Sequence, residues 1–188
     1  LCASAVGIYG DRGDEVLDES SQPGSDFLAE LCCRWEAAAE EAAGRTVCLR
    51  LGVVLDPRGG ALRRMLGPFQ LGLGGPVGHG RQYMPWISWM DLVSAMHHVL
   101  GDEEVKGPVN AVAPESVTSR EFGRHLGRVL GRPAILPLPR LLLRTMVGEV
   151  ARVLVASQRV EPRVLEEGGF SFSHSTLAKA LTRMLRRE

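Results

Sequence analysis

Residues 46–55 read T-V-C-L-R-L-G-V-V-L, a nearly continuous run of apolar and β-branched side chains. A strand with one solvated face alternates apolar and polar residues, whereas an unbroken apolar run is typical of a strand covered on both faces. Strands of that kind belong mainly to the parallel sheets of α/β proteins. This run therefore predicts a buried parallel strand and an α/β fold.

The residues before this run predict the rest of a β-α-β unit. Cys2–Ile8 (C-A-S-A-V-G-I) is a second short apolar run, which predicts another buried strand. A helix is expected between the two strands, with Ser25 or Asp26 as its N-cap and Gly44 at its C-terminal end. Its expected apolar stripe consists of Leu28, Leu31, Cys32, Trp35, Ala38, Ala39 and Ala42. One helix and two strands cannot cover both faces of a sheet, so we expect further sheet neighbours outside this sequence.

The remainder of the chain predicts further strands and helices around this unit. The long connection from Tyr9 to Ser25 follows the first strand, at the edge where open α/β sheets bind ligands. Because helical patterns dominate after residue 115, we predict two domains, residues 1–114 and residues 115–188. The expected elements are a helix after Gly59–Gly60 that Pro68 kinks, a strand over 82–89, a helix over 92–100 capped by Asp91, a strand over 108–112, a helix from Ser119 to Leu130, and helices over 140–156 and 175–186.

Composition and spacing argue against several classes of partner. Lys and Arg number 22 and equal Asp and Glu, whereas a nucleic-acid-binding protein usually carries a basic excess. No segment reaches the roughly 18 apolar residues of a membrane-spanning helix. The four cysteines lack the spacing of a metal site, and the N-terminus lacks a signal peptide. We therefore expect a cytoplasmic protein with no nucleic acid, membrane or metal partner.

A glycine-rich stretch, G-L-G-G-P-V-G-H-G, occupies Gly72–Gly80. It does not fit the G-x-G-x-x-G pattern, because the third glycine position falls on Val77 when counting starts from Gly72. The expected order of elements is also reversed, with a helix before the stretch and a strand after it. The stretch therefore predicts a turn or a substrate-side loop rather than a cradle for a dinucleotide.

Three polar residues near the strands are candidates for chemistry. Ser4 could hydrogen-bond a reacting carbonyl group, and Tyr9 could donate or accept a proton. The alternative, which the residues alone favour, is that Ser4 satisfies backbone groups and Tyr9 packs at a turn. Arg50 is a charge inside a buried strand, which is costly when unpaired. We expect it to pair with a carboxylate, a backbone carbonyl or a bound anion, and structural pairing is the favoured outcome.

Eight segments that are typical of one protein family follow one another along the chain: S-A-V-G-I-Y-G-D (4–11), W-E-A-A-A (35–39), R-L-G-V-V-L (50–55), G-L-G-G-P-V-G-H-G-R-Q (72–82), P-W-I-S-W-M-D-L (85–92), N-A-V-A-P (110–114), L-G-R-P (130–133) and Q-R-V-E-P (158–162). In this order they resemble the atypical epimerase group of the short-chain dehydrogenase/reductase superfamily, also described as the NAD-dependent epimerase/dehydratase family and as cell-division-inhibitor-like. The resemblance implies the C-terminal half of an extended NAD(P)-binding Rossmann fold, a parallel sheet with helices on both faces, followed by a mostly helical C-terminal substrate lobe. It also implies NADP or NAD as cofactor, with the main phosphate-binding loop upstream of this chain.

The resemblance also assigns roles to individual positions. Ser4 matches the serine of the superfamily, and Tyr9 is the nearest tyrosine to it. Val53 and Val54 match the turn that passes the nicotinamide ring. The remaining candidates are Arg50 on the cofactor side and, in the elements that resemble the substrate side, His79, Gln82 and Trp86.

The chain departs from the superfamily in its proton-transfer pair, Tyr-x-x-x-Lys. Its two tyrosines, Tyr9 and Tyr83, are followed four residues later by Gly13 and Ile87. Three functions stay open. The leading one is an NAD(P)-dependent oxidoreductase or epimerase in which Ser4 and Tyr9 polarise the carbonyl of a small, for example sugar-like, substrate. The others are a non-catalytic NAD(P)-binding or sensing module and an inactive truncated product. Whichever of these holds, we expect this chain to self-associate through its exposed sheet edge or to behave as partly unfolded.

Overall fold

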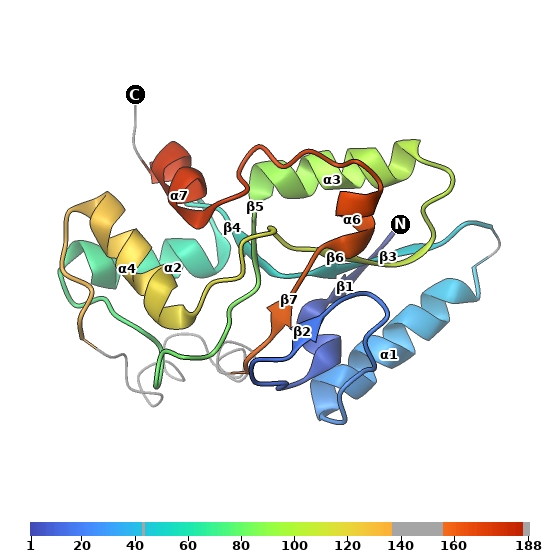
Figure 1. Ribbon diagram of the computed structural model, residues 1–188, viewed down its shortest axis with the longest axis horizontal. Helices are drawn as coiled ribbons and strands as arrows, with labels where there is room; N and C mark the ends of the chain where they lie inside the picture. The colour runs from blue at the N-terminus through green and yellow to red at the C-terminus, as the bar shows by residue number, and fades with distance from the viewer. Residues whose placement is uncertain (43, 137–155, 186–188) are drawn as a thin grey trace.

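The computed structural model describes residues 1–42, 44–136 and 156–185. Its centre is a sheet in which β3 (Val47–Leu51) lies between β1 (Cys2–Ala5) and β6 (Gly107–Ala111), and both pairings are parallel (Figure 1). The predicted parallel α/β fold is confirmed. The register places Ser4 beside Arg50 and Arg50 beside Asn110, so the three side chains share one face of the sheet.

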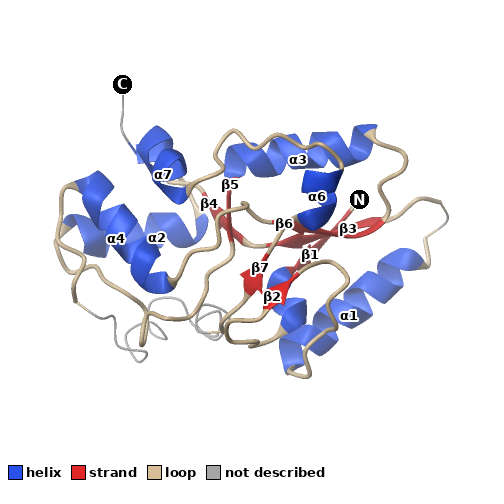
Figure 2. Ribbon diagram, in the orientation of Figure 1, coloured by secondary structure: helices blue, strands red, loops and turns tan. Residues whose placement is uncertain are grey.

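Helices cover both faces of this sheet (Figure 2). On one face, Ala95, Val99 and Leu165 pack against the apolar residues of β3 and β6. On the other face, the helix that follows β1 packs through Cys32 against Val6 and neighbouring side chains. The other elements are η1 (Val6–Tyr9), β2 (Val16–Leu17), α1 (Phe27–Glu40), β4 (Val53–Leu55), α2 (Gly60–Gln70), β5 (Trp86–Ser88), α3 (Trp89–Gly101), α4 (Ser119–Leu130), β7 (Arg159–Val160), α6 (Arg163–Glu167) and α7 (Leu177–Leu185).

A second core lies beside the sheet, where α2, α4 and α7 pack together at the left of Figure 1. Phe69 of α2, Phe122 of α4 and Leu181 of α7 are buried in it, together with Trp86. Conversely, β7 pairs with β2, and α6 packs on β6. Packing therefore crosses residue 114 in both directions, and the proposed boundary there stays a prediction.

The strand expected over 46–55 is divided in two at Gly52. β3 ends at Leu51, and β4 then leaves the main sheet to pair in parallel with β5. Gly52 has almost no room for a side chain, because a Cβ atom there would lie 3.0 Å from the Pro85 carbonyl oxygen and 2.9 Å from Val112 Cγ1. The prediction of one continuous strand was wrong. The run stays apolar across Gly52, so the sequence does not show that the chain changes its pairing partner there.

The first apolar run and the helix after it also differ from expectation. Only Cys2–Ala5 is a strand, and it is half-exposed because no described strand pairs with its outer edge. The predicted apolar stripe of α1 was wrong for Leu31 and Trp35, which are 42% and 57% exposed, and for Ala38 and Ala42, which are exposed as well. The helix instead buries Glu36, since that carboxylate forms an ion pair beneath it.

Capping residues were predicted to within a few positions. Asp26 caps α1 as expected, accepting a hydrogen bond from the amide of Ala29. Ser88 rather than Asp91 caps α3, and Thr118 rather than Ser119 caps α4. In both corrected cases an acidic residue occupies the N3 position, where its backbone amide donates to the cap side chain.

Most of the remaining predicted helices and strands are present in the structure. The helix over 175–186 and the strand over 108–112 are confirmed as α7 and β6, and α2 begins after Gly59 as predicted. The strand expected over 82–89 is confined to β5. The short elements β2, β7 and α6 were not predicted, and the helix expected over 140–156 lies almost wholly outside the described residues. In the described segments, no helix has the length and apolar character needed to cross a membrane.

Candidate functional site

A row of polar side chains crosses the main sheet beneath α1. Ser4, Arg50 and Asn110 come from adjacent strands in register, Tyr9 comes from η1, and Glu36 comes from α1. We call these five residues the polar row. Such a row breaks the apolar pattern of a buried sheet, so each of its polar groups needs a partner.

The strongest contact in the polar row is the ion pair between Arg50 and Glu36. The Arg50 guanidinium donates through Nε to Glu36 Oε1 at 3.0 Å and through Nη2 to Glu36 Oε2 at 2.8 Å. Both residues are buried. Ser4 Oγ donates to Glu36 Oε1 at 2.6 Å. The expectation that Arg50 pairs with a carboxylate is confirmed, and its partner is Glu36.

Tyr9 is fully buried, and both hydrogen-bonding directions of its hydroxyl are used. The hydroxyl donates to Asn110 Oδ1 at 2.7 Å and accepts from Arg50 Nη1 at 3.0 Å. Burial raises the pKa of Tyr9, and the nearby Arg50 charge offsets only part of that rise. The hydroxyl is therefore neutral at physiological pH. A tyrosine that exchanges protons near neutrality needs the opposite shift.

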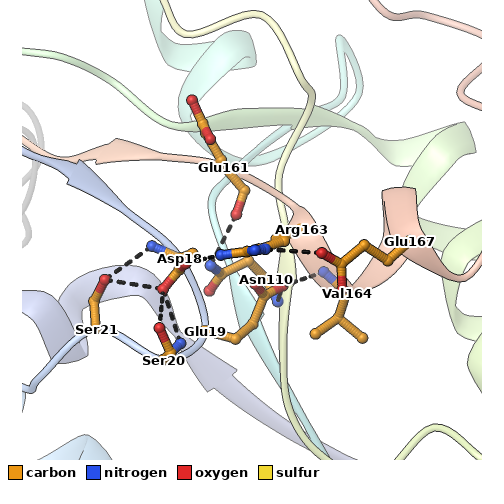
Figure 3. Close-up of polar contacts among 9 residues, drawn as sticks. All are labelled: Asp18, Glu19, Ser20, Ser21, Asn110, Glu161, Arg163, Val164 and Glu167. Carbon is orange, nitrogen blue, oxygen red and sulfur yellow. Dashed lines mark hydrogen bonds and ion pairs between the residues drawn. The ribbon is translucent and has the colours of Figure 1, made fainter.

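Glu19 extends the polar row toward α6 (Figure 3). Its Oε1 atom accepts hydrogen bonds from the backbone amides of Asn110 at 3.0 Å and Val164 at 3.2 Å. The Asn110 side-chain amide donates to the Glu161 carbonyl oxygen at 3.0 Å. Burial raises the pKa of Glu19, and its Oε2 atom has no hydrogen-bond partner among the described groups. These contacts fix the 18–19 loop, β6 and the start of α6 to one another.

Asp18, the neighbour of Glu19, has the opposite shift. It accepts hydrogen bonds from the backbone amide and hydroxyl of Ser20, and Arg163 Nη1 lies 3.0 Å from its Oδ2 atom (Figure 3). The Ser20 hydrogen bonds, together with the Arg163 charge, lower the pKa of Asp18 to about 2. The ionised form is thus favoured in the folded protein.

We expect Asp18→Asn to reduce stability more at pH 6 than at pH 2.5. A carboxyl whose pKa is lowered by folding contributes stability above its unfolded pKa of about 3.9, and that contribution disappears as the pH falls toward the folded value. The measurement is urea unfolding of both proteins at the two pH values. An equal loss of stability at both pH values would contradict the assigned contacts.

The other predicted site residues lie outside the polar row. Val53 and Val54 are half-buried in β4, paired with Trp86 and Ile87, rather than in a turn. Trp86 is fully buried, and its Nε1 atom donates to the Glu115 carbonyl oxygen at 3.0 Å. Their roles toward a cofactor or substrate stay predictions.

His79 and Gln82 lie in the loop between α2 and β5, so the predicted order of helix, glycine-rich loop and strand is confirmed. Gln82 is buried, and its Nε2 atom donates to the Val77 carbonyl oxygen at 2.9 Å. The Oε1 atom of Gln82 is buried without a hydrogen-bond partner in the described structure. His79 is exposed and lines a pocket. Substrate contact by either residue stays a prediction.

One buried cluster, which sequence reasoning missed, contains the residue types of a catalytic triad. His174 Nδ1 lies 3.1 Å from Asp91 Oδ2 and 3.3 Å from Ser88 Oγ, and Ser88 Oγ donates to Asp91 Oδ2 at 2.8 Å. Asp91 also accepts the backbone amides of Ser173 and His174. Ser88 is fully buried and caps α3, so its hydroxyl is not accessible to a substrate. The cluster holds the 173–174 segment against α3. In the sequence, the S-W-M-D spacing of residues 88–91 indicates the helix cap but gives no sign of the contact with His174.

Comparison with known proteins gives matches along nearly the whole chain. An epimerase family protein of Mycobacterium bovis is 46% identical over 183 residues, which cover 95% of this chain and 61% of that protein. The crystal structure of human epimerase family protein SDR39U1 (isoform 2) with NADPH matches with a TM-score of 0.91 and 39% identity, covering 97% of this chain and 63% of that one.

Two further matches agree with these. The nucleoside-diphosphate sugar epimerase structure from Corynebacterium glutamicum has a TM-score of 0.77 and 36% identity, with 97% of this chain and 36% of that chain covered. Residues 138–184 match a family described as a domain of unknown function, DUF1731. This chain spans about 60% of the length of the Mycobacterium and human relatives. These matches show that the chain resembles SDR39U1-like epimerase family proteins, which are atypical short-chain dehydrogenases/reductases, over nearly its whole length, and that its C-terminal part matches DUF1731.

Proposed function

We propose that this chain is the substrate-side part of an NADP(H)-dependent oxidoreductase or epimerase that acts on a small, for example sugar-like, substrate. The observation that carries the proposal is the likeness to human SDR39U1, which was crystallised with NADPH and matches with a TM-score of 0.91 at 39% identity. A bound NADPH would supply hydride transfer. The residues of this chain would position the nicotinamide end and the substrate.

The described residues fit the nicotinamide end of such a cofactor but not its phosphates. Val53 and Val54 follow the central strand and are half-buried on opposite faces of β4, so one of the two offers apolar surface for a flat ring. Arg50, the cation nearest to them in sequence, is bound to Glu36 and Tyr9 and is buried. The glycine-rich loop also departs from the pattern of a phosphate cradle. We therefore propose that the segment of the relatives not covered by this chain binds the phosphates.

A second candidate function is NADP(H) binding without catalysis. It is favoured by the hydrogen bonding and burial of the two hydroxyl groups, of Ser4 and Tyr9, that would have to polarise a substrate carbonyl. Ser4 Oγ is tied to Glu36, and the Tyr9 hydroxyl is fully buried between Asn110 and Arg50 with a raised pKa. The sequence has only two lysines, Lys106 and Lys179, and neither stands four residues after a tyrosine.

A fluorescence titration with NADPH and with NADH tests both candidates. We would compare this chain with a chimaera in which the uncovered segment of human SDR39U1 is joined to Leu1. The chimaera should bind NADPH at least an order of magnitude more tightly than this chain, because backbone amides at a helix N-terminus bind phosphates. Absence of NADPH binding by a folded chimaera would contradict the proposal.

Turnover then separates the two candidates. The NADPH-binding chimaera is mixed with a panel of carbonyl compounds and nucleotide sugars, and NADPH oxidation and sugar epimerisation are followed. Turnover of any of them supports the enzyme. Tight binding with no turnover across the panel favours the non-catalytic candidate.

A further inference from the structure

A pocket of about 620 Å³ lies between the loop before β5, the exposed face of α4 and the segment that follows α4. This volume is within the range of about 300–1,000 Å³ that is usual for small-molecule sites. Pro76 and His79 line it from the loop, and Ile135 lines it from the segment after α4. None of its lining residues belongs to the polar row.

Four arginines line this pocket: Arg120, Arg124, Arg128 and Arg132. The first three are spaced at i, i+4 and i+8 on α4, so they project from one face of the helix. Arg132 follows Gly131, the residue in the left-handed conformation that ends α4. Like charges at i, i+4 spacing repel one another, so the arrangement costs stability unless an anion accompanies it.

No carboxylate forms an ion pair with any of these four arginines within the residues that the structure describes, although the Arg124 charge contributes, after the hydrogen bonds from Thr118, to lowering the pKa of Glu121. Arginines elsewhere in the chain form ion pairs with carboxylates, as Arg12, Arg34 and Arg163 do. The side chain of Arg120 makes one hydrogen bond among the described residues, from Nη2 to the His79 carbonyl oxygen at 3.3 Å. Glu121, on the same helix, caps it with Thr118 and does not line the pocket.

The shape of the pocket depends on glycines of α4. A Cβ atom on Gly127 would lie 2.7 Å from Ala134 Cβ and 2.8 Å from the Arg132 carbonyl oxygen. A Cβ atom on Gly123 would lie 3.3 Å from the Gly75 carbonyl carbon. The absence of side chains at these positions lets the segments on both sides approach the helix closely. They flank the arginines, which stay exposed to solvent along the pocket.

We propose that this pocket binds a small molecule that carries two or more phosphate groups. Arginine is suited to such ligands because its planar guanidinium donates paired hydrogen bonds to phosphate oxygens. Pro76 and Ile135 supply apolar surface for the uncharged part of the ligand. An extended nucleic acid fits less well, since the arginines are confined to a pocket and the whole chain has no net charge. The inference does not depend on the proposed function.

Isothermal titration calorimetry with inorganic pyrophosphate tests the proposal on this protein. The variant Arg124→Gln/Arg128→Gln should bind pyrophosphate at least about 10-fold more weakly, because it loses two charge-assisted contacts. The matched control is Arg63→Gln/Arg64→Gln, which removes the same charge from exposed positions on α2. It should leave the affinity within about 2-fold, since neither Arg63 nor Arg64 lines the pocket. Unchanged melting temperatures would show that both variants fold.

Two outcomes would overturn the inference. One is no measurable binding of pyrophosphate up to millimolar concentration by the unmodified protein. The other is an equal loss of affinity in the α2 control, which would show that only the overall charge attracts the anion. Selective weakening by the α4 variant at constant ionic strength supports the site.

Discussion

Replacing Glu36 with alanine is expected to destabilise the protein by about 3–5 kcal/mol, because it leaves the buried guanidinium of Arg50 without its carboxylate. Arg50 is 7% exposed and Glu36 is 8% exposed, so water cannot take the place of the missing partner. Ser4 also loses the acceptor of its 2.6 Å hydrogen bond. The loss should therefore exceed that expected for a surface ion pair.

The same helix provides a matched control. Glu30 pairs with Arg34 on the exposed face of α1, so Glu30→Ala also removes a glutamate that is paired with an arginine. Exposed pairs contribute only about 0–1 kcal/mol, and the control should lose no more than that. Urea unfolding measures both changes at constant pH. Equal losses in the two variants would mean that Glu36 and Arg50 are not buried together.

A double variant separates charge from packing. Glu36→Met/Arg50→Met removes both charges and retains much of the side-chain volume. Replacing both partners of a buried pair with apolar residues is often close to neutral, whereas removing one partner is not. We therefore expect the double variant to be more stable than Glu36→Ala. If the double variant were as unstable as Glu36→Ala, the loss of stability would come from lost packing rather than from the unpaired charge of Arg50.

The orientation of α1 shows what sequence periodicity could and could not predict. The spacing of apolar residues correctly placed a helix there, and Asp26 correctly marked its start. The same spacing assigned Trp35 to the buried side and left Glu36 on the polar side. Because Glu36 forms its ion pair with a strand residue 14 positions away, no local pattern reports the rotation of the helix.

The central strand of the sheet was predictable from the local sequence. A strand buried on both faces shows in the sequence as an apolar run, and the run at 46–55 gave the parallel arrangement correctly. The exchange of partners at Gly52 was not predictable, since it depends on the close approach of Pro85 and Val112.

The polar row was only partly predictable. Arg50 was noticeable as a charge within an apolar strand, and its pairing with a carboxylate is confirmed. Asn110 was not identified as a site residue. An asparagine near the end of a short strand looks, in the sequence, like an ordinary residue of the following loop. Its position beside Arg50 follows from the register of β3 and β6, which the sequence does not contain in any local signal. The contact between His174 and Asp91 was also missed, because the two residues are 83 positions apart and no local pattern links them.

Trp86→Ala is expected to destabilise the protein by about 3–5 kcal/mol, the range for deleting a large buried side chain. Trp86 is 0% exposed and lies in the core formed by α2, α4 and α7, so its removal leaves a cavity that the surrounding helices cannot fill. Its Nε1 hydrogen bond to the Glu115 carbonyl oxygen is lost as well. Far-ultraviolet circular dichroism during urea unfolding measures the change without depending on tryptophan fluorescence.

Trp35→Ala is the matched control, because Trp35 is 57% exposed and its removal creates no cavity. Its effect should stay within about 0.5 kcal/mol, as is usual for surface substitutions. Trp86→Phe should fall between the two alanine variants, since it keeps an aromatic ring in the core but loses the donor to Glu115. If Trp86→Ala proved as mild as Trp35→Ala, Trp86 would not be a core residue. The sequence-based expectation that it faces a substrate would then be favoured.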